Sequence, residues 1–261
     1  MTARPLALIT GASGGLGYEF ARLLAERGHD LVVVARSGAP MEELAQWAEA
    51  RHRVEVTVLP KDLSRPGAAG EVAEELAERN LHPDVLINNA GFTQLAPFAE
   101  SDEDVMLSLL RVNIETLTQL TRRVTPGMVA RGHGRIVNLA SNAAFQPGPF
   151  MACYYASKAY VLNFSIALNE ELRGSGVTVT ALAPGPVATG FQARAGMEDA
   201  RLVKDRKLPS AGTVAEWGWA QAERGKPFAV HSPRWKFFAF AMRFLPRSTA
   251  ARLAARTNER V

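Results

Sequence analysis

The chain has 261 residues, of which 47% are hydrophobic and 21% are charged, so it is long enough for one large α/β domain or two small ones, with a sizeable buried core. The formal net charge is only +4 and the basic residues are dispersed, which argues against a nucleic-acid partner. A single cysteine, Cys153, excludes an intrachain disulfide and favours the reducing cytoplasm as the location. The apolar run at the N-terminus is too short for a signal peptide, and no stretch approaches the roughly 18 apolar residues of a membrane span.

Short apolar runs alternate with amphipathic segments along most of the chain. The apolar runs are rich in Val and Ile, as is typical of parallel strands with both faces covered, and they predict strands at 6–10, 30–35, 54–59, 84–88, 135–140, 177–182 and 227–230. The segments between them predict helices at 15–27, 40–51, 67–79, 101–130, 153–173 and 210–224. This alternation predicts one Rossmann-type domain over 1–261, an α/β fold with a doubly wound parallel sheet of about seven strands and helices on both faces.

The first predicted strand runs directly into the glycine-rich stretch TGASGGLG (10–17). In a doubly wound sheet, glycines at this turn let the backbone approach a dinucleotide pyrophosphate, and the N-terminus of the next helix supplies free N–H groups. The spacing is not G-x-G-x-x-G, and a tight turn that binds nothing is the alternative. The residues expected at the cofactor are Gly11, Ser13, Gly15, Leu16 and Gly17.

The second predicted strand ends in VVVARS, where an NAD-binding chain usually carries an acid for the ribose hydroxyls. Arg36 at this place can pair with a 2′-phosphate, so NADP(H) is preferred over NAD(H) as the predicted cofactor. The alternative is that Arg36 is a solvated loop cation. After the third strand, Asp62 is placed either to accept a hydrogen bond from the adenine amino group or to cap the next helix.

Six motifs follow one another along the chain: TGASGGLG, NNAG (88–91), VNIET with Asn113, NLAS with Ser141, YYASK (154–158) and PGPVAT (184–189). In this order they resemble the short-chain dehydrogenase/reductase family over residues 5 to about 190. The resemblance implies hydride transfer between nicotinamide and a carbonyl or alcohol, and a homodimer or homotetramer built on the helices at 101–130 and 153–173. One departure is Gly14, because many NADP-using members carry Lys or Arg there, so Arg36 is left as the main support for NADP.

Tyr154 and Lys158 are four residues apart, so they share one face of the predicted helix. A phenol has a pKa near 10, and the Lys158 ammonium is expected to lower that of Tyr154 toward neutrality. The resemblance implies that Tyr154, four residues before the lysine, and not Tyr155 is the catalytic tyrosine. Tyr154 is then suited to act as a general acid or base, while Tyr155 is expected to face the packing. Ser141, at the end of the fifth strand, can hydrogen-bond the substrate oxygen and stabilise developing charge.

The family resemblance implies further roles. Lys158 also binds the nicotinamide ribose, and Asn113 holds a water that relays protons to Lys158, although an Asn within a helix can instead bond only to the backbone. The remaining cofactor contacts implied by the resemblance are Asn89, Ala90, Gly91, Pro184, Gly185, Val187 and Thr189.

Two segments beside the expected site are rich in large apolar side chains. The segment 143–153 and the irregular loop 184–209 contribute Phe145, Phe150, Met151, Phe191, Met197 and Leu202. They predict a medium or long apolar ketone or aldehyde as the substrate, with NADP(H) as the reductant. The histidines, at 29, 52, 82, 133 and 231, form no ligand cluster with Cys153, so no metal site is expected.

A basic and aromatic tail spans 234–261. Its large apolar side chains are Trp235, Phe237, Phe238, Phe240, Met242, Phe244 and Leu245. Packing within the protein or its oligomer is the favoured interpretation, ahead of a cap on the substrate cleft or contact with an anionic membrane surface. An alternative function is a non-catalytic dinucleotide-binding regulator that acts through this tail, although the complete Asn–Ser–Tyr–Lys set argues against it.

Overall fold

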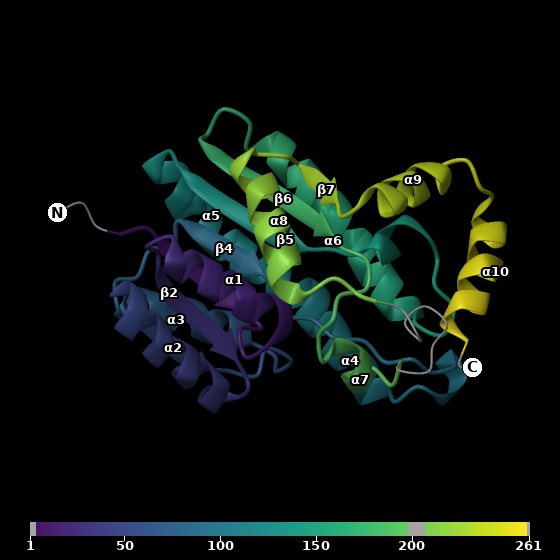
Figure 1. The fold of residues 1–261 in the computed structure, drawn as a ribbon, viewed down its shortest axis with the longest axis horizontal. Helices are drawn as coiled ribbons and strands as arrows, with labels where there is room; N and C mark the ends of the chain where they lie inside the picture. Colours follow the sequence, from purple (N-terminus) through teal and green to yellow (C-terminus); the bar gives the residue numbers. More distant parts are fainter. Residues whose placement is uncertain (1–3, 198–206, 260–261) are drawn as a thin grey trace.

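One parallel sheet forms the centre of the molecule, in the strand order β3–β2–β1–β4–β5–β6–β7. The computed structural model describes residues 4–197 and 207–259 (Figure 1). The strands are β1 Leu6–Thr10, β2 Asp30–Ala35, β3 Val56–Pro60, β4 Val85–Asn88, β5 Gly134–Leu139, β6 Val177–Ala183 and β7 Phe228–Val230. The predicted fold and its seven strands are confirmed, with strand ends displaced by one or two residues. The order reverses between β1 and β4, which is where an open parallel sheet binds its ligand.

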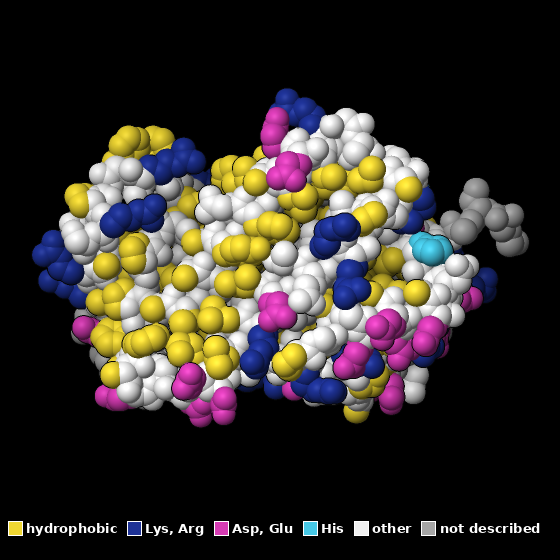
Figure 2. Space-filling view, turned by 180° about the vertical axis from the view of Figure 1, so that it is seen from behind, with side chains coloured by type: hydrophobic (Ala, Val, Ile, Leu, Met, Phe, Trp, Pro, Cys, Tyr) yellow, Lys and Arg dark blue, Asp and Glu magenta, His cyan; other side chains and the backbone are white. Residues whose placement is uncertain are grey.

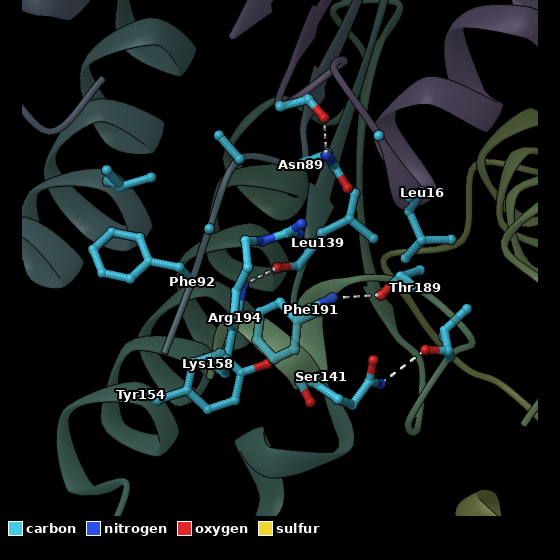
Figure 3. A pocket seen from close by; sticks show the side chains of 18 of the residues that line it. Leu16, Asn89, Phe92, Leu139, Ser141, Tyr154, Lys158, Thr189, Phe191 and Arg194 are labelled. Atoms are coloured by element: carbon cyan, nitrogen blue, oxygen red, sulfur yellow. Dashed lines mark hydrogen bonds between the residues drawn. The ribbon is translucent and has the colours of Figure 1, made fainter. Parts of the chain in front are cut away.

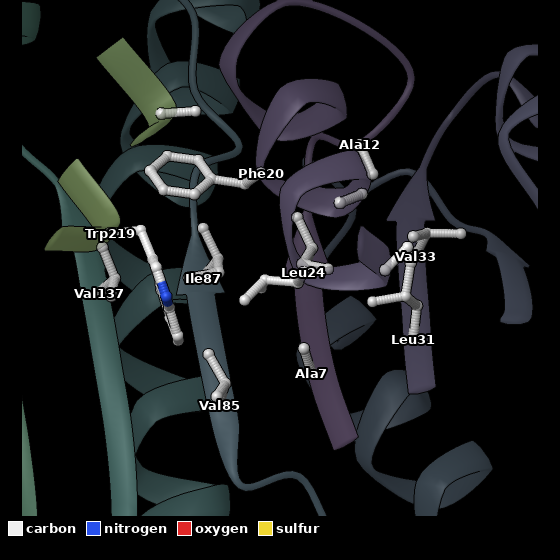
Figure 4. Packing of buried hydrophobic residues seen from close by; sticks show 14 of the residues in the cluster. Ala7, Ala12, Phe20, Leu24, Leu31, Val33, Val85, Ile87, Val137 and Trp219 are labelled. Atoms are coloured by element: carbon white, nitrogen blue, oxygen red, sulfur yellow. The ribbon is translucent and has the colours of Figure 1, made fainter. Parts of the chain in front are cut away.

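Helices cover both faces of the sheet, and alternate residues of each strand supply the two cores. In β1, Ala7 and Ile9 face one core while Leu8 faces the other. The first core lies against α1 (Gly15–Glu26), α2 (Gly38–His52) and α8 (Ala211–Glu223), with Phe20 and Trp219 packed on the strands (Figure 4). The second lies against α3 (Ala68–Glu78), α5 (Leu117–Arg131) and α6 (Ala152–Glu171). This two-sided burial explains why the strands are continuous apolar runs.

The long helix predicted over 101–130 is confirmed as one unbroken run of helical backbone, Glu103–Arg131, but it is not α-helical throughout. The structure has α4 (Glu103–Leu110), a π-helical turn η2 (Arg111–Thr116) and then α5. Asp102 begins α4, because its Oδ1 accepts from the backbone N–H groups of Asp104 and Val105 at 2.9 and 3.2 Å. In η2 the Asn113 side chain bonds to the backbone of Phe92 in another segment. A wider turn of this kind is common at functional sites, and hydrophobic periodicity does not reveal it.

The C-terminal part contains two helices that were not predicted as separate elements. They are α9 (Pro233–Ala241) and α10 (Arg247–Asn258), and they lie together at the end of the molecule far from the N-terminus (Figure 1). Pro233 occupies the first turn of α9, and Pro246 immediately precedes α10, so each proline is a start signal in the sequence. Within the predicted loop 184–209, Phe191–Arg194 form a short helix, α7, while Leu202 lies outside the described residues.

Candidate active site

A cavity of about 790 Å³ opens at the carboxyl ends of the central strands. Figure 3 shows Ser141, Tyr154 and Lys158 on one side of it, and Leu16 and Thr189 on the other. The cavity brings together nearly all of the residues predicted from the sequence: Gly11, Ser13, Gly15, Leu16, Arg36, Asp62, Asn89, Ala90, Gly91, Ser141, Tyr154, Lys158, Pro184, Gly185, Val187 and Thr189. Gly17 and Asn113 do not line it and lie behind its wall.

The glycine loop is shaped for close approach of a ligand to the backbone. Gly11 and Gly15 have φ of +68° and +58°, a region that costs a residue with a side chain about 1 kcal/mol or more. A Cβ on Gly17 would lie 2.3 Å from the Gly11 carbonyl oxygen, so this glycine lets α1 pack closely on the loop. Gly14 faces open space, with no atom within 4 Å of a Cβ placed there. This concave turn before a helix N-terminus fits a pyrophosphate.

Thr10 and Asn89 lock the NNAG turn to the glycine loop. The Thr10 hydroxyl accepts from the backbone N–H groups of Asn89 and Ala90, both at 3.0 Å. The Asn89 side-chain amide donates to the carbonyls of Thr10 and Gly11 at 3.0 and 3.2 Å. The amide of Asn89 therefore positions the loop and is not directed into the cavity. Sequence reasoning missed Thr10, although it opens the TGASGGLG motif.

Asp62 and Arg36 lie together at the predicted adenosine end. Asp62 Oδ1 accepts from the backbone N–H and the hydroxyl of Ser64 at 3.0 and 2.7 Å. Burial alone would raise the pKa of Asp62, but these hydrogen bonds and the charges of Arg36 and Arg65 lower it below its usual value. The alternative in which Asp62 caps the next helix is wrong, because α3 begins after Gly67. Arg36 is exposed at the cavity rim.

Tyr154 is half-buried in the cavity wall, and its pKa moves in the direction opposite to the one expected. Burial raises the pKa of Tyr154 to about 12, and the hydrogen bond with Ser141 offsets only part of that rise. Burial also lowers the pKa of Lys158 to about 8, since that side chain is only 5% exposed. Lys158 Nζ donates to the Leu139 carbonyl at 2.7 Å and lies 5.7 Å from the centre of the Tyr154 ring. Desolvation thus favours the neutral form of both groups, so the predicted lowering of the Tyr154 pKa is wrong.

Asn113 ties the π-helical turn to the wall of the site. Its Nδ2 donates to the Phe92 carbonyl at 3.2 Å and to the Ser157 hydroxyl at 3.1 Å, and its Oδ1 accepts from the Phe92 N–H at 3.2 Å. A Cβ on Gly91 would lie 3.1 Å from Asn113 Oδ1 and 3.5 Å from Lys158 Nζ, so both side chains flank this glycine. Sequence reasoning assigned no role in the site to the Ser157 hydroxyl. This hydroxyl accepts from Asn113 Nδ2 at 3.1 Å and donates to the Tyr154 carbonyl at 2.7 Å. The side chain of Asn113 positions neighbouring groups and does not contact Lys158 directly.

The substrate side of the cavity is apolar around Tyr154. The ring of Phe191 lies 5.8 Å from that of Tyr154, and Met151 and Met197 also line the wall. Tyr155 is buried against them, as expected, and its hydroxyl donates to Asn258 Oδ1 of α10 at 3.2 Å. Two of the apolar residues expected there lie elsewhere, since Phe145 packs with Trp235 and Phe228, and Phe150 lines a second, smaller cavity of about 40 Å³.

The segment that follows β6 is held from behind by the tail. A Cβ on Gly185 would lie 2.2 Å from Trp235 Nε1 of α9, so only glycine allows this packing. The Asn142 N–H donates to the Pro184 carbonyl at 2.9 Å, which joins the segment to the turn after Ser141. Within residues 4–197 and 207–259, the side chains of His, Cys, Asp and Glu form no group of three or more that could hold a metal.

Comparisons with known proteins agree with this arrangement. A family model of short chain dehydrogenases matches residues 5–200. The structure of a short-chain dehydrogenase from Sphingobium yanoikuyae in complex with NADPH has a TM-score of 0.81 at 33% identity, covering 95% of this chain and 98% of that one. A very-long-chain 3-oxoacyl-CoA reductase from Pyrenophora tritici-repentis is 31% identical over 88% of this chain and 67% of that protein. Sulfoacetaldehyde reductase 2 from Chromohalobacter salexigens is 37% identical over 81% of this chain and 85% of that protein.

The chain spans only part of the length of several curated relatives, between 52% and 67% for three of them. The family match nevertheless covers well over half of the chain, and it includes the glycine loop, Ser141, Tyr154 and Lys158. The chain therefore belongs to the short-chain dehydrogenase/reductase family of oxidoreductases.

Proposed function

We propose that this protein is an NADP(H)-dependent carbonyl reductase with Ser141, Tyr154, Lys158 and Asn113 as its working residues. The observation that carries the proposal is a single cavity that joins the glycine loop to the hydroxyls of Ser141 and Tyr154 and the amine of Lys158. A regulator that only bound the dinucleotide would not need a phenol and an amine buried together beside it. We propose that residues 1–261 form one domain and that the protein acts in the cytoplasm.

The cavity fits a nicotinamide dinucleotide along its length. The glycine loop would hold the pyrophosphate, Asp62 and Arg36 the adenosine half, and Lys158 the nicotinamide ribose, with Pro184, Gly185, Val187 and Thr189 around the ring. When bound, the cofactor would supply the hydride for reduction of a carbonyl or accept one from an alcohol. Both hydrogen bonds from Ser64 go to Oδ1 of Asp62. Its Oδ2 can therefore accept a hydrogen bond from the adenine amino group.

The proton roles follow from the two pKa values. A phenol with a pKa of about 12 is fully protonated at neutral pH, so Tyr154 starts as an acid that can donate to a carbonyl oxygen. The Ser141 hydroxyl bonds to Tyr154 and is placed to bond the same oxygen and to stabilise its developing charge. Lys158, with a pKa of about 8, is mostly an ammonium at neutral pH and becomes neutral just above it. While Lys158 is an ammonium, its proton can replace the one that Tyr154 gives to the substrate, and Gly91 and Asn113 lie beside its Nζ.

The preference for NADP(H) over NAD(H) rests on Arg36. Replacing Arg36 with Ala is expected to weaken NADPH binding by about 10–100-fold, because a charge-assisted hydrogen bond is worth roughly 1.5–3 kcal/mol. NADH binding should change little, since that molecule has no 2′-phosphate. Dissociation constants from quenching of tryptophan fluorescence would measure both.

Arg65→Ala is the matched control for this experiment. Arg65 is also exposed and also acts on Asp62, but it does not line the cavity. Equal weakening of NADPH and NADH binding in Arg36→Ala, or an equal effect of Arg65→Ala, would contradict the role of Arg36.

We propose a medium or long apolar ketone or aldehyde as the substrate. Met151, Phe191 and Met197 line the wall next to Tyr154, and the very-long-chain 3-oxoacyl-CoA reductase is named for a long-chain substrate. In a series of methyl ketones of growing length, kcat/KM is expected to rise about fourfold per added CH₂, since each buried CH₂ contributes about 0.8 kcal/mol. NADPH oxidation followed by absorbance would measure it. A preference for sulfoacetaldehyde, the substrate named for the Chromohalobacter relative, over every apolar compound would refute the apolar class.

We also propose a homodimer or homotetramer that uses the outer faces of α4, α5 and α6. Leu107, Val129 and Tyr160 are exposed on these helices, with exposed fractions of 37–39%. Apolar side chains of this kind are suited to a contact between copies of the chain.

A further inference from the structure

Helix α9 and the turn after it carry apolar side chains on two sides. Along one side lie Trp235, Phe238, Met242 and Leu245, which are partly buried. Along the other lie Phe237, Phe240 and Phe244, with 74%, 58% and 73% of their surface exposed. Each row follows the spacing of a helix face, so the tail contains two interleaved apolar stripes. We call the three exposed phenylalanines the outer ridge, and the rings of Phe240 and Phe244 lie 5.2 Å apart within it.

The inner row fixes the orientation of α9, so the outer ridge cannot turn inward. Trp235 packs with Ala183, Val230 and Ala239, and its indole occupies the space beside Gly185. A rotation that buried the outer ridge would expose this row and break the contact with Gly185. Packing within the protein, one half of the sequence-based interpretation of the tail, therefore holds for the inner row, whereas Phe237, Phe240 and Phe244 are exposed on this chain.

Helix α10 is held in the same way and turns a basic face outward. Ala250, Ala254 and Asn258 are buried at intervals of four residues. Asn258 accepts from the Tyr155 hydroxyl and its Nδ2 donates to the Pro149 carbonyl at 2.9 Å. The opposite side of α10 therefore lies in solvent, and it carries Leu253, Arg252 and Arg256.

The charge of these two helices has one sign. Residues 233–259 contain one acid, Glu259, and six exposed basic residues, Arg234, Lys236, Arg243, Arg247, Arg252 and Arg256. This segment alone is more positive than the net +4 of the whole chain. None of the six forms an ion pair with any acidic side chain in the described ranges, and Figure 2 shows basic and hydrophobic side chains mixed at this end of the molecule, at the left.

We propose that α9 and α10 dock on an anionic lipid surface, with the outer ridge inserted at the headgroup boundary and the six cations bonded to lipid phosphates. Apolar rings flanked by Lys and Arg are what such a surface binds. A second copy of the chain fits worse, because two such faces would bring twelve positive charges together. Among the described residues, every helix is too short or too polar to cross a bilayer, so the contact is a peripheral one.

Docking of this kind would place the cavity beside the lipid. Helix α9 packs on Gly185, and α10 is bonded to Tyr155, and both of these residues line the cavity. An apolar carbonyl compound dissolved in the bilayer would then have a short path to Tyr154. This consequence rests on the proposed function, whereas docking itself does not.

The test is flotation of the full chain with vesicles, which needs no turnover. One set is made of equal parts phosphatidylcholine and phosphatidylglycerol, and the other of phosphatidylcholine alone. We expect clear binding to the anionic vesicles, weaker binding to the neutral ones, and loss of binding as salt screens the charges. Failure of the protein to float with anionic vesicles at low salt overturns the proposal, whether or not the protein reduces any carbonyl.

Two double variants with matched controls distinguish specific vesicle binding by α9 and α10 from non-specific binding by other exposed residues. Phe237→Ser with Phe244→Ser should weaken vesicle binding at least tenfold, while Phe98→Ser, at a side chain 65% exposed elsewhere, should not. Arg252→Gln with Arg256→Gln should weaken it about 30-fold, at about fivefold per residue, while Arg224→Gln with Lys226→Gln should not.

Unchanged thermal unfolding and NADPH binding show that each variant is folded. Equal losses in a variant pair and its control overturn the proposal. A second result would also overturn it. If the wild-type protein does not bind vesicles, and the Phe237 and Phe244 changes convert an oligomer to a monomer in gel filtration, the outer ridge is a contact between copies of the chain.

Discussion

Replacing Tyr154 with Phe is expected to lower kcat/KM for carbonyl reduction by about 10²–10⁴-fold, the usual contribution of a positioned proton donor. The change removes one oxygen from the cavity wall and keeps the ring that packs beside Phe191. NADPH binding should stay within a few-fold of the wild type, because the glycine loop, Arg36 and Lys158 are untouched. Steady-state rates with the best ketone of the length series, together with fluorescence titration of NADPH, would measure both quantities.

Tyr155→Phe is the control that the chain itself provides. Its hydroxyl is also buried and also hydrogen-bonded, but to Asn258 of α10 and away from Ser141. It should cost about 1 kcal/mol of stability through the lost hydrogen bond and leave the rate nearly unchanged. If the two variants lost activity equally, or if Tyr154→Phe retained most of the turnover, the acid would have to be sought elsewhere in the cavity.

Replacing Lys158 with Met is expected to remove most activity and at the same time to stabilise the fold. The amine is 5% exposed, and its pKa is lowered from 10.5 to about 8 by burial. Such a shift corresponds to a penalty of about 3 kcal/mol for the charged form. Loss of the hydrogen bond to the Leu139 carbonyl offsets about 1–2 kcal/mol, so the net gain at neutral pH is about 1–2 kcal/mol.

The sign of the pH dependence distinguishes this cause from better packing. Between about pH 8 and 10.5 the unfolded chain holds a proton on Lys158 that the folded chain has released, so the stability of the wild type rises with pH across this window. The advantage of Lys158→Met should therefore be complete below pH 8 and shrink toward pH 10.5. Urea unfolding at several pH values would measure it.

The exposed Lys226→Met serves as the control for Lys158→Met and should show no such window. A Lys158→Met protein that is less stable than the wild type at neutral pH, or that differs from it by a constant amount at every pH, would refute the desolvation argument. A stabilised protein with undiminished turnover would instead refute the role of Lys158 in the site. The two readouts fail separately, so each tests its own claim.

Local spacing explains what could be predicted from this sequence. The strands were found because parallel strands buried on both faces must be continuous apolar runs, as with Leu31, Val32, Val33 and Val34. Tyr154 and Lys158 were found because the family's motif pairs the lysine with a tyrosine four residues earlier, an interval that places both side chains on one side of a helix. The glycine loop was found because a turn with φ above zero leaves few choices of residue.

Some features had a signal in the sequence that was not used. Pro233 and Pro246 mark the starts of α9 and α10, and the two interleaved rows in WKFFAFAMRFL are visible once helix spacing is applied to both. Asn113 was recognised by its motif, but the π-helical turn around it was not. In that turn the Asn113 side chain is hydrogen-bonded to the backbone of Phe92, which lies 21 residues away in the chain.

By itself, the sequence determined which segments form strands and helices, where the glycine turn lies, and that Tyr154 and Lys158 share a helix face, because each of these depends on neighbours within a few residues. Only the tertiary structure decided that Tyr154 is held neutral with a pKa of about 12, that Asp62 bonds Ser64 and does not cap α3, and that Phe237, Phe240 and Phe244 face outward. Desolvation, hydrogen-bond partners and exposure are set by atoms from distant parts of the chain. They take definite values only when the sheet and its two layers of helices have brought those parts together.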